Sequence, residues 1–155
     1  MAVLIYTNVL LRLTNADDAR FQVAIDAIMK LHQRGESLHL TAQNLIEFRN
    51  AATRPSAVNG LGLSAAETES RTFEIEKVFP LLPVFPLLPE TPDIYPAWKA
   101  MVSALGIIGK QVHDARLIAV CHVHKVTHLL TFNTVDFARL ARYGPGVVVV
   151  DPAGV

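Results

Sequence analysis

Short apolar runs alternate along the chain with stretches in which apolar residues recur at helical spacing. The run at residues 2–5 is typical of a buried strand, and residues 38–41, 127–131 and 147–150 are further strand candidates. Helices are predicted from Phe21 up to a stop at Gly35 and over residues 42–53, 65–79, 98–105, 114–124 and 134–142. Because strands alternate with helices, the pattern predicts one α/β domain over residues 1–155, with a mainly parallel central sheet.

One apolar segment has a different pattern. The six residues Val-Phe-Pro-Leu-Leu-Pro at 78–83 are repeated at 84–89, and prolines recur every third residue from Pro80 to Pro92. Three residues per turn is the polyproline II period. A stretch with this proline content cannot continue a helix or form a central strand. We interpret it as a rigid connector packed on the surface, in preference to a ribbon that docks a partner.

Composition excludes several classes of protein. Lysine and arginine number 14, as do aspartate and glutamate, so bulk positive charge cannot drive nucleic-acid binding, which would need a local patch. A hydrophobic content of 51% excludes a disordered chain. The single cysteine, Cys121, excludes a disulfide within the chain and favours a reducing, cytoplasmic location. We expect neither a secretory signal nor a membrane span, because the N-terminal residues lack a basic region and no apolar run reaches about 18 residues.

Polar side chains follow the predicted strands at the points where ligands bind in open α/β sheets. Tyr6, Thr7 and Asn8 come directly after the first strand, and Asn133 and Asp136 follow the strand at 127–131. We expect these side chains to meet at one edge of the sheet.

Two more carboxylates fall near this edge, Glu47 in the helix after the second strand and Asp114 at a helix start. Converging carboxylates and amides suit Mg²⁺ or Mn²⁺, and such a cluster supports metal-assisted phosphodiester cleavage. Each residue also has a structural explanation. Asp114 complements a helix dipole, Asn133 with Asp136 resembles a capping box, and Glu47 can face water. All of these residues fall at predicted strand ends or helix starts. This common placement favours a shared metal site over the separate structural explanations.

Taken together, four segments resemble the motifs of PIN domains, in the family's order, at residues 3–11, 44–48, 113–117 and 130–137. The resemblance covers nearly the whole chain and implies a three-layer PIN-like fold, with helices flanking the sheet. It further implies a metal-dependent endoribonuclease using Mg²⁺ or Mn²⁺. Small members of this length are mostly VapC-like toxins, which cleave RNA, are held inactive by a cognate antitoxin and commonly form homodimers.

The resemblance also assigns roles to individual residues. It implies that the surviving metal ligands are Glu47, Asp114 and Asp136, and that Asn133 orients water or binds the metal weakly. It implies contacts to the substrate from Thr7, Asn8 and Arg116.

Tyr6 departs from the family pattern, which carries aspartate immediately before Thr-Asn. A phenol with an ordinary pKa near 10 is neutral at pH 7 and a poor Mg²⁺ ligand, and it is large enough to fill the space of an ion. We therefore expect cleavage to be lost or reduced by about 30- to 1,000-fold. The alternative is a catalytically inactive PIN-like protein that retains antitoxin or RNA binding. A plain α/β domain that binds a small molecule is the third possibility, should the carboxylates lie far apart.

Overall fold

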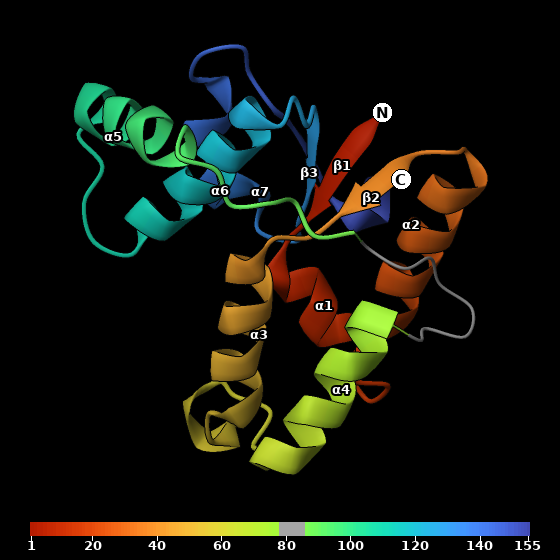
Figure 1. Ribbon diagram of the computed structural model, residues 1–155. Helices are drawn as coiled ribbons and strands as arrows, with labels where there is room; N and C mark the ends of the chain where they lie inside the picture. Colours follow the sequence, from red (N-terminus) through yellow and green to blue (C-terminus); the bar gives the residue numbers. More distant parts are fainter. Residues whose placement is uncertain (78–85) are drawn as a thin grey trace.

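A parallel sheet lies at the centre of the computed structural model, which describes residues 1–77 and 86–155. Its strands are β1 (Ala2–Ile5), β2 (Ser37–His39), β3 (His128–Leu130) and β4 (Val148–Val150). They lie in the order β2-β1-β3-β4, and Figure 1 shows β1 between β2 and β3. In the register of the sheet, Leu4 of β1 stands between His39 and Leu129. The predicted α/β architecture with a mainly parallel sheet is confirmed.

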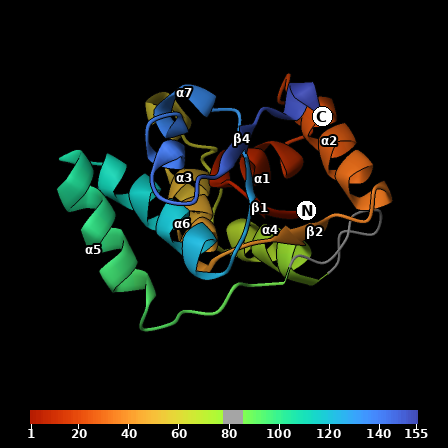
Figure 2. The same ribbon diagram turned by 90° about the horizontal axis from the view of Figure 1, so that it is seen from above.

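Helices cover both faces of the sheet, so the domain has three layers (Figures 1 and 2). Successive residues of a strand point to opposite faces. Val3 and Ile5 therefore pack on one face and Leu4 on the other. The face of Val3 and Ile5 is covered by α1 (Thr7–Leu13), α2 (Phe21–Gln33), α3 (Ala42–Thr53) and α4 (Ala65–Lys77). The face of Leu4 is covered by α5 (Ile94–Leu105), α6 (Gln111–Val123) and α7 (Thr134–Phe137).

Helix α1 was not predicted. It begins directly after β1, with Tyr6 as its N-cap, and buries Val9, Leu10 and Leu13 against the sheet. These residues have helical spacing, but the run is too short for the period to stand out from the apolar strand before it. The consequence is that Thr7 lies in the first turn of a helix, where its side chain is held rigidly.

The other differences lie at element ends. Helix α5 begins at Ile94 instead of residue 98, because Pro96 sits in the first turn, where its missing N–H has no helical partner to lose. Helix α7 ends at Phe137, and a separate 3₁₀ turn follows at Leu140–Arg142. Gly35 adopts φ +73° just after α2, as its predicted stop requires.

A buried capping box orients α3, which carries Glu47. The backbone N–H of Asn44 donates to Thr41 Oγ1 at 3.1 Å, and the backbone N–H of Thr41 donates to Asn44 Oδ1 at 3.0 Å. Both side chains are buried. These bonds satisfy orphan groups at the helix start and fix the angle at which α3 leaves β2. Glu47 is thereby directed to the carboxyl edge of the sheet.

The proline segment is described only from Pro86 onward. There the backbone runs parallel to the end of β2, with Leu40 N–H donating to Pro86 O at 3.2 Å and Leu88 N–H donating to Leu40 O at 2.8 Å. Residues 78–85 of the predicted polyproline segment and the predicted helix end at 79 lie outside the described residues. Within residues 1–77 and 86–155, no helix combines the length and apolar character needed to cross a membrane.

Candidate functional site

An open cavity of about 450 Å³ lies at the carboxyl end of β1, where the starts of α1, α6 and α7 approach α3. Seven residues of the site predicted from the sequence line it, namely Tyr6, Thr7, Asn8, Glu47, Asp114, Asn133 and Asp136. The expected convergence therefore occurs, and the carboxylates of Glu47, Asp114 and Asp136 face one cavity. Arg116 does not line this cavity.

A hydrogen bond between Tyr6 and Asp114 crosses the cavity. The Tyr6 hydroxyl donates to Asp114 Oδ1 at 3.0 Å, and the edge of its ring packs on Phe137, with 4.9 Å between ring centroids. Burial raises the pKa of Tyr6 well above its ordinary value, and the charges of Asp114 and Glu47 raise it further. The phenol is therefore a neutral donor that occupies one oxygen of the carboxylate.

Asp114 holds its proton more tightly than an ordinary aspartate. Burial raises its pKa, and the hydrogen bond from Tyr6 opposes that effect. The nearby carboxylates Glu47 and Asp136 raise the pKa further, whereas the charge of Lys110 lowers it. Glu47 and Asp136 therefore lie close enough to Asp114 to disfavour its charged form.

Glu47 is fixed through both of its oxygens. Thr7 Oγ1 donates to Oε2 at 2.8 Å, and Gln43 Nε2 donates to Oε1 at 2.8 Å. Thr7 is therefore a positioning side chain of the acidic site, in addition to any contact with substrate. Gln43 was not singled out as a site residue, although it lies four residues before Glu47 on the same helix face, where such pairs meet.

Asn8 holds the loop after β3 in place. Its Nδ2 donates to Thr131 Oγ1 at 3.1 Å, and the backbone N–H of Phe132 donates to its Oδ1 at 3.2 Å. The alternative of a capping box at Asn133 is wrong. The Asn133 side chain makes no capping bond at the start of α7 and instead donates from Nδ2 to Asp136 Oδ2 at 2.5 Å.

Arg116 lies on α6, two residues after Asp114 and outside the cavity, and is already paired. Its Nη2 contacts Glu90 Oε2 at 2.5 Å, and its Nη1 donates to Gln43 Oε1 at 2.9 Å. The cations that do line the cavity, Arg54 and Lys110, were not identified from the sequence. No motif marks them, and only the fold brings them to the acidic residues.

The carboxylates as arranged do not fit a divalent cation. In the described part of the chain, no group of three or more His, Cys, Asp or Glu side chains is placed to hold a metal ion. The physical reason is that the Tyr6 hydroxyl donates to Asp114 Oδ1 inside the cavity, and an ion at about 2.0–2.6 Å from that carboxylate would compete with the phenol.

Solved structures share this fold at low sequence identity. The chain is similar to FitAcB from Neisseria gonorrhoeae, at 17% identity and a TM-score of 0.60, over 99% of each chain. It is similar to VapBC2 from Rickettsia felis, solved bound to a DNA fragment from their promoter, at 13% identity and a TM-score of 0.66, over 97% of this chain and 98% of the other.

A third similar structure is VapC20 from Mycobacterium tuberculosis, a sarcin-ricin loop cleaving toxin, at 17% identity and a TM-score of 0.58. The match covers 88% of this chain and 94% of the toxin. No curated protein matches the sequence. The model of the PIN domain family matches residues 3–143, which include every residue of the acidic cavity. The chain therefore belongs to the PIN domain family.

Proposed function

We propose that this chain is a VapC-like PIN-domain ribonuclease whose cleavage activity is suppressed by Tyr6. The observation that carries the proposal is the hydrogen bond from the Tyr6 hydroxyl to Asp114 Oδ1 at 3.0 Å, inside a cavity lined by two further carboxylates. The cavity retains the carboxylates that an RNA phosphodiester hydrolase needs, and Tyr6 occupies the place where the family's opening motif carries aspartate.

Replacing Tyr6 with aspartate would give the cavity the carboxylate that stands at this position in the family's opening motif. An aspartate at position 6 would remove the phenol from Asp114 and add a fourth carboxylate to the cavity. That donor set suits Mg²⁺ or Mn²⁺, which would provide the charge that phosphodiester hydrolysis requires. Glu47 is already held by Thr7 and Gln43, so the remaining geometry needs little reorganisation.

The test is an RNA cleavage assay in Mn²⁺ and in EDTA. The chain is compared with its Tyr6→Asp variant, and Asp114→Asn in the variant background is the matched control. We expect Tyr6→Asp to cleave at least about 30-fold faster in Mn²⁺, and Asp114→Asn to abolish the gain. Equal cleavage by the chain and by Tyr6→Asp would refute suppression by Tyr6.

The competing proposal is a catalytically inactive member that binds an antitoxin. It is favoured by the exposed side chain of Phe73 on α4, which lines a shallow surface hollow, since exposed aromatic side chains are frequent anchors at protein interfaces. Similar structures are of FitAcB and VapBC2, which supports an antitoxin partner for this chain. Native mass spectrometry of the protein from its source, expected in the cytoplasm, distinguishes a homodimer from a complex with a second, small protein.

A further inference from the structure

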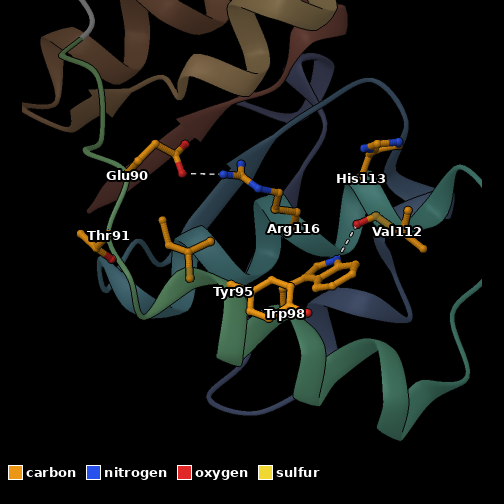
Figure 3. A pocket seen from close by; sticks show the side chains of 8 residues that line it. Glu90, Thr91, Tyr95, Trp98, Val112, His113 and Arg116 are labelled. Carbon is orange, nitrogen blue, oxygen red and sulfur yellow. Dashed lines mark hydrogen bonds and ion pairs between the residues drawn. The ribbon is translucent and has the colours of Figure 1, made fainter.

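A second cavity, of about 540 Å³, lies between the start of α5 and the first turns of α6 (Figure 3). Its volume is within the range of roughly 300–1,000 Å³ that small-molecule sites occupy. The aromatic rings of Tyr95 and Trp98 form one wall, and Glu90 and Arg116 lie across from them. None of these four residues belongs to the acidic cavity.

In the aromatic wall, Trp98 is anchored by a hydrogen bond and Tyr95 presents its ring to solvent. Trp98 Nε1 donates to Val112 O at 2.8 Å, which fixes the indole, and the Tyr95 ring lies 5.6 Å from it, tilted by 32°. Tyr95 is 63% exposed, although the burial of a ring this size is favourable. An exposed, pre-positioned aromatic pair is a stacking surface for a planar ring.

The opposite wall carries both a donor and an acceptor. Arg116 is held between Glu90 and Gln43, with its side chain about one third exposed, so the guanidinium and the Glu90 carboxylate both border the cavity. Nucleobase edges present hydrogen-bond donors and acceptors side by side, and arginine and carboxylate side chains pair with them. A purely apolar ligand would form no hydrogen bonds with this wall, so the wall favours a ligand that has polar groups.

The second cavity adjoins the acidic one. His113 lines both cavities, and it precedes Asp114 directly in α6. A groove of about 680 Å³ between α3 and α6 shares Glu47 with the acidic cavity, and it shares Glu90 and Arg116 with the aromatic one. A single extended strand can therefore occupy both cavities at once.

We infer that the Tyr95–Trp98 cavity binds an unpaired base of the same single-stranded RNA whose backbone lies over the acidic cavity. This subsite rests on the proposed function, because the acidic cavity supplies the reason to expect RNA. It makes Tyr95 a binding residue for substrate, and it explains how a chain with no net charge holds RNA. Stacking on the aromatic rings and hydrogen bonds to the base edge supply part of the RNA-binding free energy that positive charge supplies in basic RNA-binding proteins.

Trp98 is the only tryptophan of the chain and lies in this cavity, so its fluorescence reports on the subsite alone. The experiment titrates the full chain in EDTA, where no metal supports cleavage, with a labelled single-stranded RNA of about ten nucleotides. Strand anisotropy gives the affinity, and Trp98 fluorescence gives occupancy. We expect saturable quenching of Trp98 by this RNA and none by the same strand with abasic sites.

Variants separate stacking from general binding. We expect Tyr95→Ala to weaken RNA binding by about 10-fold and Tyr95→Phe to retain it, because the phenylalanine ring still stacks. Val58→Ala is the control, since Val58 is an exposed apolar side chain (55%) outside both cavities, and this variant should bind RNA normally. Quenching by the abasic strand, or equal binding by Tyr95→Ala, would overturn the inference.

Two further outcomes distinguish the proposals. If Tyr6→Asp cleaves RNA but Trp98 does not respond, the ribonuclease proposal stands and the subsite is refuted. If Trp98 responds through Tyr95 but Tyr6→Asp never cleaves, the subsite stands and the ribonuclease proposal fails. If Tyr95→Ala changes the oligomeric mass in light scattering and leaves RNA binding intact, a second copy covers the cavity and the inference is overturned.

Discussion

The Tyr6 hydroxyl and Asp114 Oδ1 lie 3.0 Å apart and connect the end of β1 to α6 across the acidic cavity. This bond favours the charged form of Asp114 and opposes the effect of burial on its pKa. Removal of the hydroxyl in Tyr6→Phe should therefore raise the pKa of Asp114 further. A carboxyl-carbon NMR titration of both proteins measures the change, and an unchanged or lower pKa in the variant would contradict the assignment of the bond.

Asp114 also makes the stability of the fold depend on pH. Its pKa in the folded chain is raised above the ordinary value of 3.8, so the neutral form is favoured by folding. This contribution to stability is complete below about pH 3.8 and is lost as the pH rises through the raised pKa.

The variant Asp114→Asn cannot ionise and should not show this loss. We expect it to be more stable than the parent chain at pH 7, by less than about 1 kcal/mol because water reaches the carboxylate. The difference should vanish near pH 3. Urea unfolding at pH 7 and at pH 3 measures this difference in stability. A variant that is less stable than the parent chain at pH 7 would contradict the prediction.

Thr7 is expected to affect stability and cleavage because it holds Glu47 in position. Thr7→Val removes the donor to Glu47 Oε2 and leaves the buried amide of Asn44 without its acceptor, Thr7 Oγ1. The expected cost is about 1–2 kcal/mol of unfolding free energy, because buried polar groups lose partners. In the Tyr6→Asp background, cleavage should fall by about 10-fold, because Glu47 loses its position.

Thr7→Ser is the matched control, since it keeps the hydroxyl. It should retain the cleavage rate of the Tyr6→Asp background. Loss of cleavage in Thr7→Ser as large as in Thr7→Val would show that the methyl group matters and that the hydrogen bond does not.

Asn44 supports the site through the fold. It is fully buried, completes the capping box with Thr41 and contacts Thr7. Asn44→Ala should lower the unfolding free energy by about 2–3 kcal/mol, because it removes the reciprocal cap and leaves buried groups unpaired. Asn50→Ala, at an exposed position of the same helix, should change stability by less than about 0.5 kcal/mol. Equal effects in thermal unfolding would rule out the special role of the cap.

The sequence pattern was sufficient for the sheet and for most helices, because buried parallel strands are short apolar runs and helices show their period. It failed at α1, because the seven residues Thr7–Leu13 are too few for a helical period to be recognised directly after a strand. The convergence of the acidic residues could be predicted, because they follow strand ends in the sequence and a parallel sheet places its carboxyl ends at one edge.

The partners of those residues could not be predicted. The pairing of Arg116 with Glu90, and the cavity at Tyr95 and Trp98, depend on how α5 packs against α6 and on the path of the chain after Pro86. Neither leaves a periodic or motif signal. Tyr6 was noticed from the sequence, but its hydrogen bond to Asp114 follows only from the packing of β1 beside α6.

Mn²⁺ binding is the direct test of whether Tyr6 prevents a divalent cation from binding in the acidic cavity. Electron paramagnetic resonance of free Mn²⁺ during titration counts bound ions for the chain and for Tyr6→Asp, with Tyr6→Asp plus Asp114→Asn as control. We expect about one bound ion per chain in Tyr6→Asp and binding at least about tenfold weaker in the parent chain and the control. Equally tight Mn²⁺ binding by the parent chain would show that Tyr6 does not exclude the ion.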